Sequence, residues 1–286
     1  MMRPRLCLSA LTLALLSVAI AGLAQPHAAR AADNDKPIRA LFIAGGCCHD
    51  YAQQKDIITQ GISARAIVQW VIAYDPDKGT KHVNPVYENP DWAKNFDVVV
   101  HDECSAAVVD LKIIDRILKP HREGLPGVVL HCAMHCYRSQ GYPKTITPWF
   151  EFTGLPSTGH GAQAPIAVSF IDKNSPITKP LQDWTTINEE LYNNGVSNKL
   201  LDTAQPLARG RQTTDRKGKT TEHDFVTVWT NTYHGKTRVF CTTLGHNNVT
   251  VGDARYLDLV TRGLLWSVGK LDAAHLQPAK KVLMDR

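Results

Sequence analysis

The chain has 286 residues, of which 43% are hydrophobic and 21% are charged, and its formal net charge is +5. This length suffices for one α/β domain or at most two small ones. Arg3, Arg5 and Arg30 lie in a segment that we expect to be removed; the 32 basic residues less these three leave 29, against 27 acidic residues. A balance near +2, with no basic patch interleaved with aromatic residues, argues against nucleic-acid binding.

Residues 1–31 are predicted to be a signal peptide. Two arginines precede an apolar run over residues 6–24, and residues 29–31 read Ala-Arg-Ala, which fits a cleavage site. Cleavage after Ala24 and an uncleaved membrane anchor are the alternatives. With residues 32–37 as a polar leader, the sequence predicts a periplasmic or secreted protein that has no membrane contact after cleavage.

Six cysteines remain beyond the predicted signal peptide, and their pairing is not set by the sequence. In an oxidising compartment we expect some of them to form disulfides. No Cys-x-x-Cys pair is present, which disfavours a zinc knuckle or a thioredoxin-type centre. The six are Cys47, Cys48, Cys104, Cys132, Cys136 and Cys241.

The first half of the chain alternates short apolar runs with helical patterns. Uniformly apolar strands separated by helices are typical of a parallel sheet that is covered on both faces. We therefore predict a doubly wound, mostly parallel α/β fold of the flavodoxin-like or class I glutamine amidotransferase-like type. The predicted strands are 38–44, 67–74, 96–100 and 127–130, the predicted helices 53–66 and 106–122, and residues 77–91 a loop.

The second half is richer in strands, which predicts extra β-hairpin strands added to the sheet. Its charged segment 209–223 is expected to be an exposed hairpin tip or loop, and 253–268 an amphipathic closing helix. The α/β domain is predicted to span residues 38–270, with a C-terminal tail over 271–286. The predicted strands are 166–171, 185–192, 225–230 and 238–243.

Histidines, acidic residues and cysteines recur where the predicted strands end. Ligands of open parallel sheets bind outside the carboxyl ends of the strands, so these side chains are expected to share one site. A single histidine there is more often a capping residue, but the repetition is informative. The segments are Cys47-Cys48-His49-Asp50, His101-Asp102-Glu103-Cys104, His131 to Cys136, and Leu244-Gly245-His246-Asn247.

Four histidines at these ends are candidate ligands for a divalent metal such as zinc. Imidazole is a common zinc ligand and a common acid–base group near neutral pH. His131 and His135 are four residues apart and would share one side of a helical turn; alternatively, His135 only caps or packs in that turn. The candidate ligands are His49, His131, His135 and His246.

Cys132 follows a predicted strand at a strand-to-helix turn, where this fold class places a nucleophile. A glutaminase-type turn would flank the cysteine with glycines, whereas His131 and Ala133 stand here. The sequence therefore favours a buried thiol or a disulfide partner over a Cys132-dependent amidase.

The order of several short motifs resembles the ThuA (trehalose utilisation) family over residues 38–270. The resemblance implies a class I glutamine amidotransferase-like fold that does not need a catalytic cysteine. It also implies a role in sugar metabolism, on disaccharides or on keto-sugar derivatives made by a partner sugar-oxidising dehydrogenase. The motifs are Gly45-Gly46-Cys47-Cys48-His49-Asp50-Tyr51, Val128 to His131, Glu189-Glu190-Leu191-Tyr192, Leu244-Gly245-His246 and Gly263 to Trp266.

Carried over position by position, the resemblance singles out a small set of site residues. Glu189 stands where the family usually has Asp, and Ser175 where a histidine is typical, while His160 matches a histidine before the middle strand. The cysteines are not part of the family pattern. The residues singled out are His49, His131, Glu190, Tyr192 and His246.

The expected chemistry is that of a hydrolase, lyase or isomerase acting on a small carbohydrate. Burial near histidines would raise the pKa of Glu190, which could then act as acid or base. His246 could shuttle a proton or bind the metal, and Tyr192 could donate a hydrogen bond to a sugar hydroxyl, with His131 as a further catalytic candidate. The alternatives are an edge strand without a site, or a protein that binds a sugar or metal without catalysis.

Overall fold

The structure is a computed structural model that describes residues 36–193 and 200–284. These residues build a ten-stranded sheet in the order β10-β2-β1-β3-β4-β9-β8-β7-β5-β6. The predicted α/β class is confirmed. The predicted signal peptide lies outside the described residues, and within the described ranges no helix has the length and apolar character needed to span a membrane.

One part of the sheet, from β10 to β9, is parallel throughout. β3 and β4 are buried along their whole length, which explains their uninterrupted apolar runs. Because the strands run in one direction, their carboxyl ends meet at the same edge. The strands are β1 (Ile38–Gly46), β2 (Val68–Asp75), β3 (Val98–Cys104), β4 (Gly127–Leu130), β9 (Thr237–Thr242) and β10 (Leu283–Met284).

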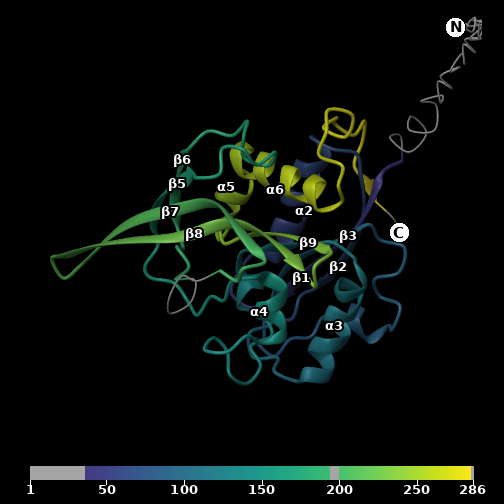
Figure 1. Cartoon of the computed structure of the whole chain (residues 1–286), viewed down its shortest axis with the longest axis horizontal. Coiled ribbons are helices and arrows are strands. Elements are labelled where there is room, and N and C mark those ends of the chain that lie inside the picture. Colours follow the sequence, from purple (N-terminus) through teal and green to yellow (C-terminus); the bar gives the residue numbers. More distant parts are fainter. Residues whose placement is uncertain (1–35, 194–199, 285–286) are drawn as a thin grey trace, which may run out of the picture. The chain divides into compact units, whose positions relative to one another are not determined.

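The other part of the sheet is antiparallel and is built by the second half of the chain, as predicted. The charged segment 209–223 forms the outer part of a long hairpin of β7 and β8 that projects from the sheet (Figure 1). Its tip is the turn between Arg216 and Lys219. The strands are β5 (Ala164–Phe170), β6 (Trp184–Glu189), β7 (Ala204–Arg216) and β8 (Lys219–Tyr233).

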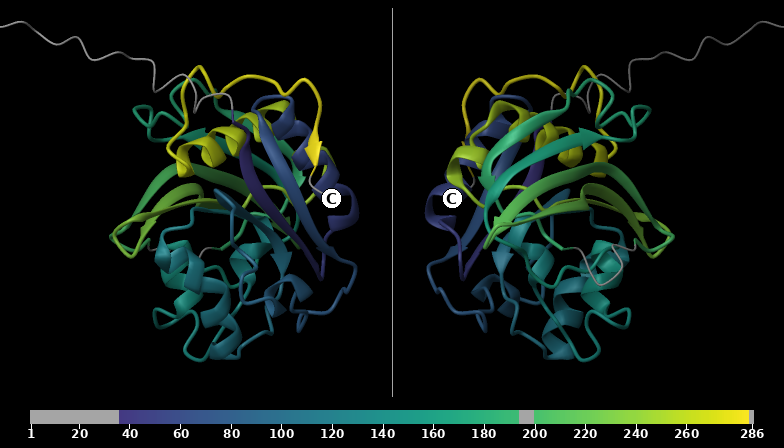
Figure 2. Two further views of the ribbon diagram at one scale, coloured as in Figure 1. Left: turned by 90° about the vertical axis from the view of Figure 1, so that its right-hand side faces the viewer. Right: turned by 90° about the vertical axis from the view of Figure 1, so that its left-hand side faces the viewer.

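Helices cover both faces of the sheet (Figures 1 and 2). α2, α5 and α6 lie over one face, and α3 and α4 over the other, so two hydrophobic cores sandwich the strands. This is the doubly wound arrangement. The helices are α2 (Tyr51–Ser63), α3 (Leu111–Glu123), α4 (Pro148–Thr153), α5 (Asn248–Val251) and α6 (Ala254–Ser267), with short 3-10 turns η2 (Pro85–Glu88) and η3 (His131–His135).

Several details differ from the sequence prediction. β7 is not among the predicted strands, and the strand expected over 185–192 ends at Glu189. The helix expected over 106–122 begins at Leu111, because the Asp110 side chain accepts a hydrogen bond from the backbone N–H of Lys112 and caps the helix there. In the predicted tail, Leu283 and Met284 pair with β2 and extend the sheet at its edge.

His101 and Glu103 on β3 do not join the site at the strand ends, so that expectation is wrong for these two residues. Both side chains are fully buried between the sheet and the α3 layer. Glu103 accepts hydrogen bonds from Tyr87 (2.6 Å) and Tyr137 (2.9 Å), and lies 2.9 Å from Nδ1 of His101. Alternation along a strand turns these residues away from the face that carries α2 and into this network.

The network ends at His121 on α3, and its protons can be counted. Nδ1 of His121 donates to the carbonyl of Leu125 (2.7 Å), and Nε2 of His121 lies 3.2 Å from Nε2 of His101. Burial and the neighbouring His101 lower the pKa of His121 to about 3, so His121 is neutral and its Nε2 accepts from His101. The remaining contact, between His101 and Glu103, then needs one shared proton, which makes this buried pair neutral overall.

The depressed pKa of His121 predicts a specific acid sensitivity. Its ordinary pKa of 6.5 lies above the folded value, so the unfolded chain takes up the proton first and stability falls as pH drops from 6.5 towards 3. Proton uptake by the unfolded chain at this residue lowers the free energy of unfolding by about 3 kcal/mol between pH 7 and pH 4. His121→Asn keeps an N–H near Leu125 but does not titrate. In urea unfolding at both pH values the variant should lose about 3 kcal/mol less than the parent; equal losses would contradict the assignment.

Candidate functional site

The carboxyl ends of β1, β4 and β9 carry the three central histidines of the site. β1 pairs with β3, β3 with β4 and β4 with β9, all in parallel, so these ends lie along one edge of the sheet. His49 follows β1, His131 follows β4 and His246 follows β9. Topology therefore brings together residues that are almost 200 positions apart in the chain, as the sequence predicted.

The three imidazoles form a tight cluster. Ring centroids are 4.7 Å apart for His49 and His131, 4.7 Å for His49 and His246, and 5.6 Å for His131 and His246. One nitrogen of each ring lies within 4.8 Å of a nitrogen of both others. Nδ1 of His49 is buried and has no hydrogen-bond partner among the described residues. Three converging imidazoles with such a nitrogen could hold a metal ion.

Backbone contacts fix the ring of His131 and the turn that carries His246. Nδ1 of His131 donates to the carbonyl of Thr243 (2.6 Å), which leaves Nε2 facing the cluster. The buried carboxylate of Glu189 accepts from the backbone N–H groups of His246 and Asn247, both at 3.0 Å, and holds the turn after β9. Gln54 on α2 donates to the carbonyl of His246 (3.0 Å). Such outer contacts are typical of metal-binding histidines.

Glu190 lies at the centre of the remaining contacts. Its Oε2 is 3.5 Å from Nε2 of His131 and 3.4 Å from Nε2 of His160, and its Oε1 is 3.1 Å from Nδ1 of His246. The His246 contact is ionic rather than a well-aligned hydrogen bond. The Tyr192 hydroxyl lies within hydrogen-bonding distance of Nε2 of His131 (3.0 Å). The structure thus brings together His49, His131, Glu190, Tyr192 and His246, with His160 beside them.

The electrostatics of the site correct one expectation. Burial alone would raise the pKa of Glu190, but the contacts with His131 and His246 outweigh it and hold that pKa below its usual range, so Glu190 is a carboxylate. The same contact with Glu190 raises the pKa of His246. Burial, together with the neighbouring His131 and His246, lowers the pKa of His49 to about 2, so His49 is a neutral imidazole.

His135 lies beside the cluster but faces a different partner. Its ring stacks on Tyr192 with centroids 4.1 Å apart, and its Nε2 lies 2.8 Å from the Ser157 hydroxyl. Its nitrogens are not among those that gather with the other three histidines. The 3-10 turn η3 has about three residues per turn, so residues four apart do not share one face.

Cys132 is buried in the core beneath the site. A hydrogen bond with Cys104 and burial both raise the pKa of the Cys132 thiol, which opposes formation of the nucleophilic thiolate. The structure therefore argues against the Cys132-dependent amidase.

A family model described as ThuA, trehalose utilisation, matches residues 40–267. The chain belongs to the ThuA family. Two solved structures share the fold of this ThuA family member. A protein described as ThuA-like from Bacteroides uniformis ATCC 8492 is 15% identical with a TM-score of 0.60, the alignment covering 86% of this chain and 97% of that one. Another, from Parabacteroides merdae ATCC 43184, is 19% identical with a TM-score of 0.58, covering 86% and 93%. No curated protein sequence matches the chain.

A surface cleft of about 300 Å³ opens onto His49 in this ThuA family member. One side of the cleft is formed by the end of β1 and the start of α2, and the other side by the loop after β2. Tyr74, Asp75, Asp77 and Lys78 form its far wall. A larger hollow of about 630 Å³ lies between the segment after η2 and α3, but none of the site histidines lines it. Of the site residues, His49 lines the smaller cleft, whereas His131, Glu190, Tyr192 and His246 do not.

Sequence reasoning gave no supporting role to Glu189, which it noted only as a family position, and missed Gln54 and Thr243. The side chains of Glu189 and Gln54 hold the turn that carries His246, and Thr243 acts through its backbone carbonyl. The adjacent acidic pair Glu189-Glu190 was the one available signal, since one carboxylate of the pair faces the site and the other holds the loop.

Proposed function

We propose that the protein is an enzyme that acts on a small carbohydrate, with Glu190 as the catalytic base and a divalent metal ion such as zinc held by His49, His131 and His246. The observation that carries the proposal is the convergence of three imidazoles around one carboxylate at the sheet edge. The carbohydrate class rests on membership of the trehalose utilisation family.

The donor set fits zinc. Zinc takes neutral imidazole nitrogens at about 2.0–2.1 Å, and three protein ligands with an open position are typical of catalytic sites. The orientation of His131 by Thr243 and the position of His246 against Glu190 match the outer contacts that such ligands make. The metal would supply Lewis-acid polarisation of a substrate oxygen.

Glu190 supports the proton-transfer part of the proposal. Its carboxylate is ionised and 6% exposed, so it can accept a proton while shielded from bulk water. The proton would come from water, from a sugar hydroxyl or from the carbon beside a keto group, which covers hydrolase, isomerase and lyase chemistry. Tyr192 would donate its hydroxyl hydrogen bond to a sugar oxygen in place of His131.

The cleft beside His49 has the chemistry that sugars bind. The carboxylates of Asp75 and Asp77 can accept hydrogen bonds from sugar hydroxyls, and the Tyr74 ring offers an apolar face. Asp75 and Asp77 each use Oδ1 to bind a backbone N–H, which fixes their orientation. A cleft of about 300 Å³ accommodates a monosaccharide unit.

A metal-removal experiment tests this proposal. The purified protein is assayed for zinc and other divalent metals, and native and oxidised disaccharides are screened for turnover. We expect about one metal ion per chain, loss of turnover after chelation, and recovery on adding the metal back. His246→Ala should bind metal at least tenfold more weakly, whereas His223→Ala, on the projecting hairpin, should bind it as the parent does.

Three results would overturn the proposal in different ways. If metal-free protein turned over the substrate at the full rate, the reaction would rest on acid–base chemistry by Glu190 and would need no metal. Sugar binding without turnover over long incubation would identify a binding protein. Neither binding nor turnover of any sugar would end the carbohydrate assignment.

A further inference from the structure

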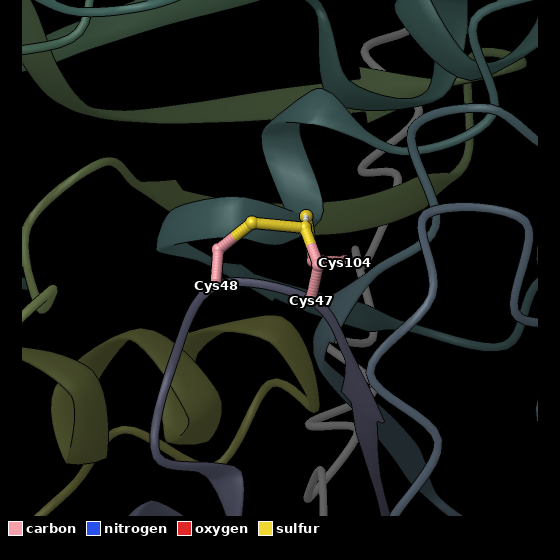
Figure 3. Close-up of side chains that lie close together, drawn as sticks. All are labelled: Cys47, Cys48 and Cys104. Carbon is pink, nitrogen blue, oxygen red and sulfur yellow. Dashed lines mark hydrogen bonds between the residues drawn. A yellow bond between two sulfur atoms is a disulfide. The ribbon is translucent and has the colours of Figure 1, made fainter.

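Three cysteine sulfurs gather at the ends of β1 and β3. Cys47 and Cys48 are joined by a disulfide between consecutive residues. Sγ of the buried Cys104 lies 3.4 Å from Sγ of Cys47, and the three sulfurs all lie within 4.8 Å of one another. Figure 3 shows the Cys104 sulfur directly beside that of Cys47, at the end of the β1 strand.

The backbone is shaped to bring these sulfurs together. Gly46 pairs with Cys104 in the parallel register, and its φ of +87° turns the chain at this point. A Cβ at Gly46 would lie 2.2 Å from the carbonyl oxygen of Cys104, so the close approach requires glycine. Cys48 has a φ of +85°, which L residues rarely adopt. Strained backbone that persists beside a site is a feature of functional positions.

We propose that Cys47, Cys48 and Cys104 form a binding site for a soft metal ion, such as Cu(I), when the Cys47–Cys48 disulfide is reduced. Thiolates select soft ions. Sulfurs bound to one ion at about 2.3 Å lie roughly 3.8–4.0 Å apart. In the oxidised site Sγ of Cys47 lies 3.4 Å from Sγ of Cys104 and is bonded to Sγ of Cys48, so reduction must let the sulfurs move apart to reach that spacing. This site is independent of the proposed function.

The three cysteines differ in how deeply they are buried and how accessible they are to solvent, and this gives them different roles in the site. Cys104 is 2% exposed and anchored in β3, so it provides a fixed ligand. Cys48 is exposed, so both a reductant and an ion can reach the site from solvent. Closing the disulfide removes two of the three ligands at once, so the oxidation state of Cys47 and Cys48 decides whether the ion is bound.

The chemistry balances with a phosphine as the reductant. The phosphine gives up an electron pair and takes the oxygen of one water molecule, and the sulfur–sulfur bond becomes two thiols. The ion then replaces the protons of the Cys47, Cys48 and Cys104 thiols. A phosphine is preferable to a dithiol here because a dithiol would compete for the ion.

The test is an anaerobic titration of the full chain with Cd²⁺, followed by the ultraviolet charge-transfer band of cadmium thiolates. Imidazole ligands do not give this band; Zn²⁺ is added before reduction to fill the three-histidine cluster, so that this cluster does not take up Cd²⁺ and shift the equivalence point. We expect the band to saturate at one equivalent in phosphine-treated protein and to be absent from untreated protein. Cys48→Ser replaces an exposed residue, removes the disulfide and leaves two of the three ligands, and should abolish the one-equivalent band.

Cys241→Ser is the matched control, because its sulfur is buried in β9 and donates instead to the carbonyl of Thr153. This variant should keep the full band. The proposal fails if reduced protein gives no band, if untreated protein gives the same band, or if Cys48→Ser retains it. Failure here leaves the histidine site untouched, since the two sets share no residue.

Discussion

Replacing Glu190 by glutamine should lower kcat on the carbohydrate substrate by about 1,000-fold, within the usual contribution of one acid–base group. Glutamine has nearly the same shape and can still contact His131, His160 and His246. It cannot accept a proton, however. Metal content and the unfolding midpoint should stay close to those of the parent, so the loss would be in the chemical step. Steady-state kinetics, with metal analysis of the same preparation, measure both.

Glu222→Gln is the matched control for this substitution. Glu222 lies on the projecting part of β8, where its carboxylate is 3.5 Å from Nε of Arg211 at the surface. Its kcat should equal that of the parent. If Glu190→Gln retained a kcat within tenfold of the parent, Glu190 would not be the base, and the histidines alone would have to carry proton transfer.

The fold could be predicted from sequence largely because its strands differ so clearly from its helices. The run Val98-Val99-Val100 is buried on both faces, and such a run fits only a covered parallel sheet. The pairing of Leu283 and Met284 with β2 could not be predicted, because two residues carry no periodicity. The start of α3 was misplaced by one turn, since the apolar Val108 precedes the Asp110 cap and continues the helical pattern.

The rule that the carboxyl ends of parallel strands meet at one edge of the sheet predicted part of the site, and the residues outside that rule could not be placed from the sequence. His49, His131 and His246 meet because they follow parallel strands at one edge. The same rule failed for His101 and Glu103, because β3 continues to Cys104 and places them inside the sheet. The protonation state of Glu190 also needed coordinates, because burial and the histidine contacts shift its pKa in opposite directions and only distances show which is larger.

Glu103→Ala should be the most destabilising single substitution argued for this chain. It removes the acceptor of the Tyr87 and Tyr137 hydroxyls and the partner of His101 in a fully buried layer. Losing one member of a buried charged or proton-sharing pair costs about 3–5 kcal/mol, because the remaining groups stay desolvated. Urea unfolding at pH 7 measures the loss. Glu123→Ala, at the exposed end of α3, should change the free energy of unfolding by less than about 0.5 kcal/mol.

The Glu103→Gln variant tests whether the network needs only hydrogen bonds at this position or a negative charge as well. The His101–Glu103 pair holds one proton and is neutral overall, so a neutral amide can donate to Nδ1 of His101 and accept from Tyr137, and loses only the acceptor for the Tyr87 hydroxyl, which also binds Oε1. We therefore expect this variant to lose only about 1 kcal/mol, close to the net value of one hydrogen bond. A loss as large as that of the alanine variant would show that the network needs a full negative charge at Glu103. In that case His101 would have to be an imidazolium, and the proton count would assign the shared proton to the ring.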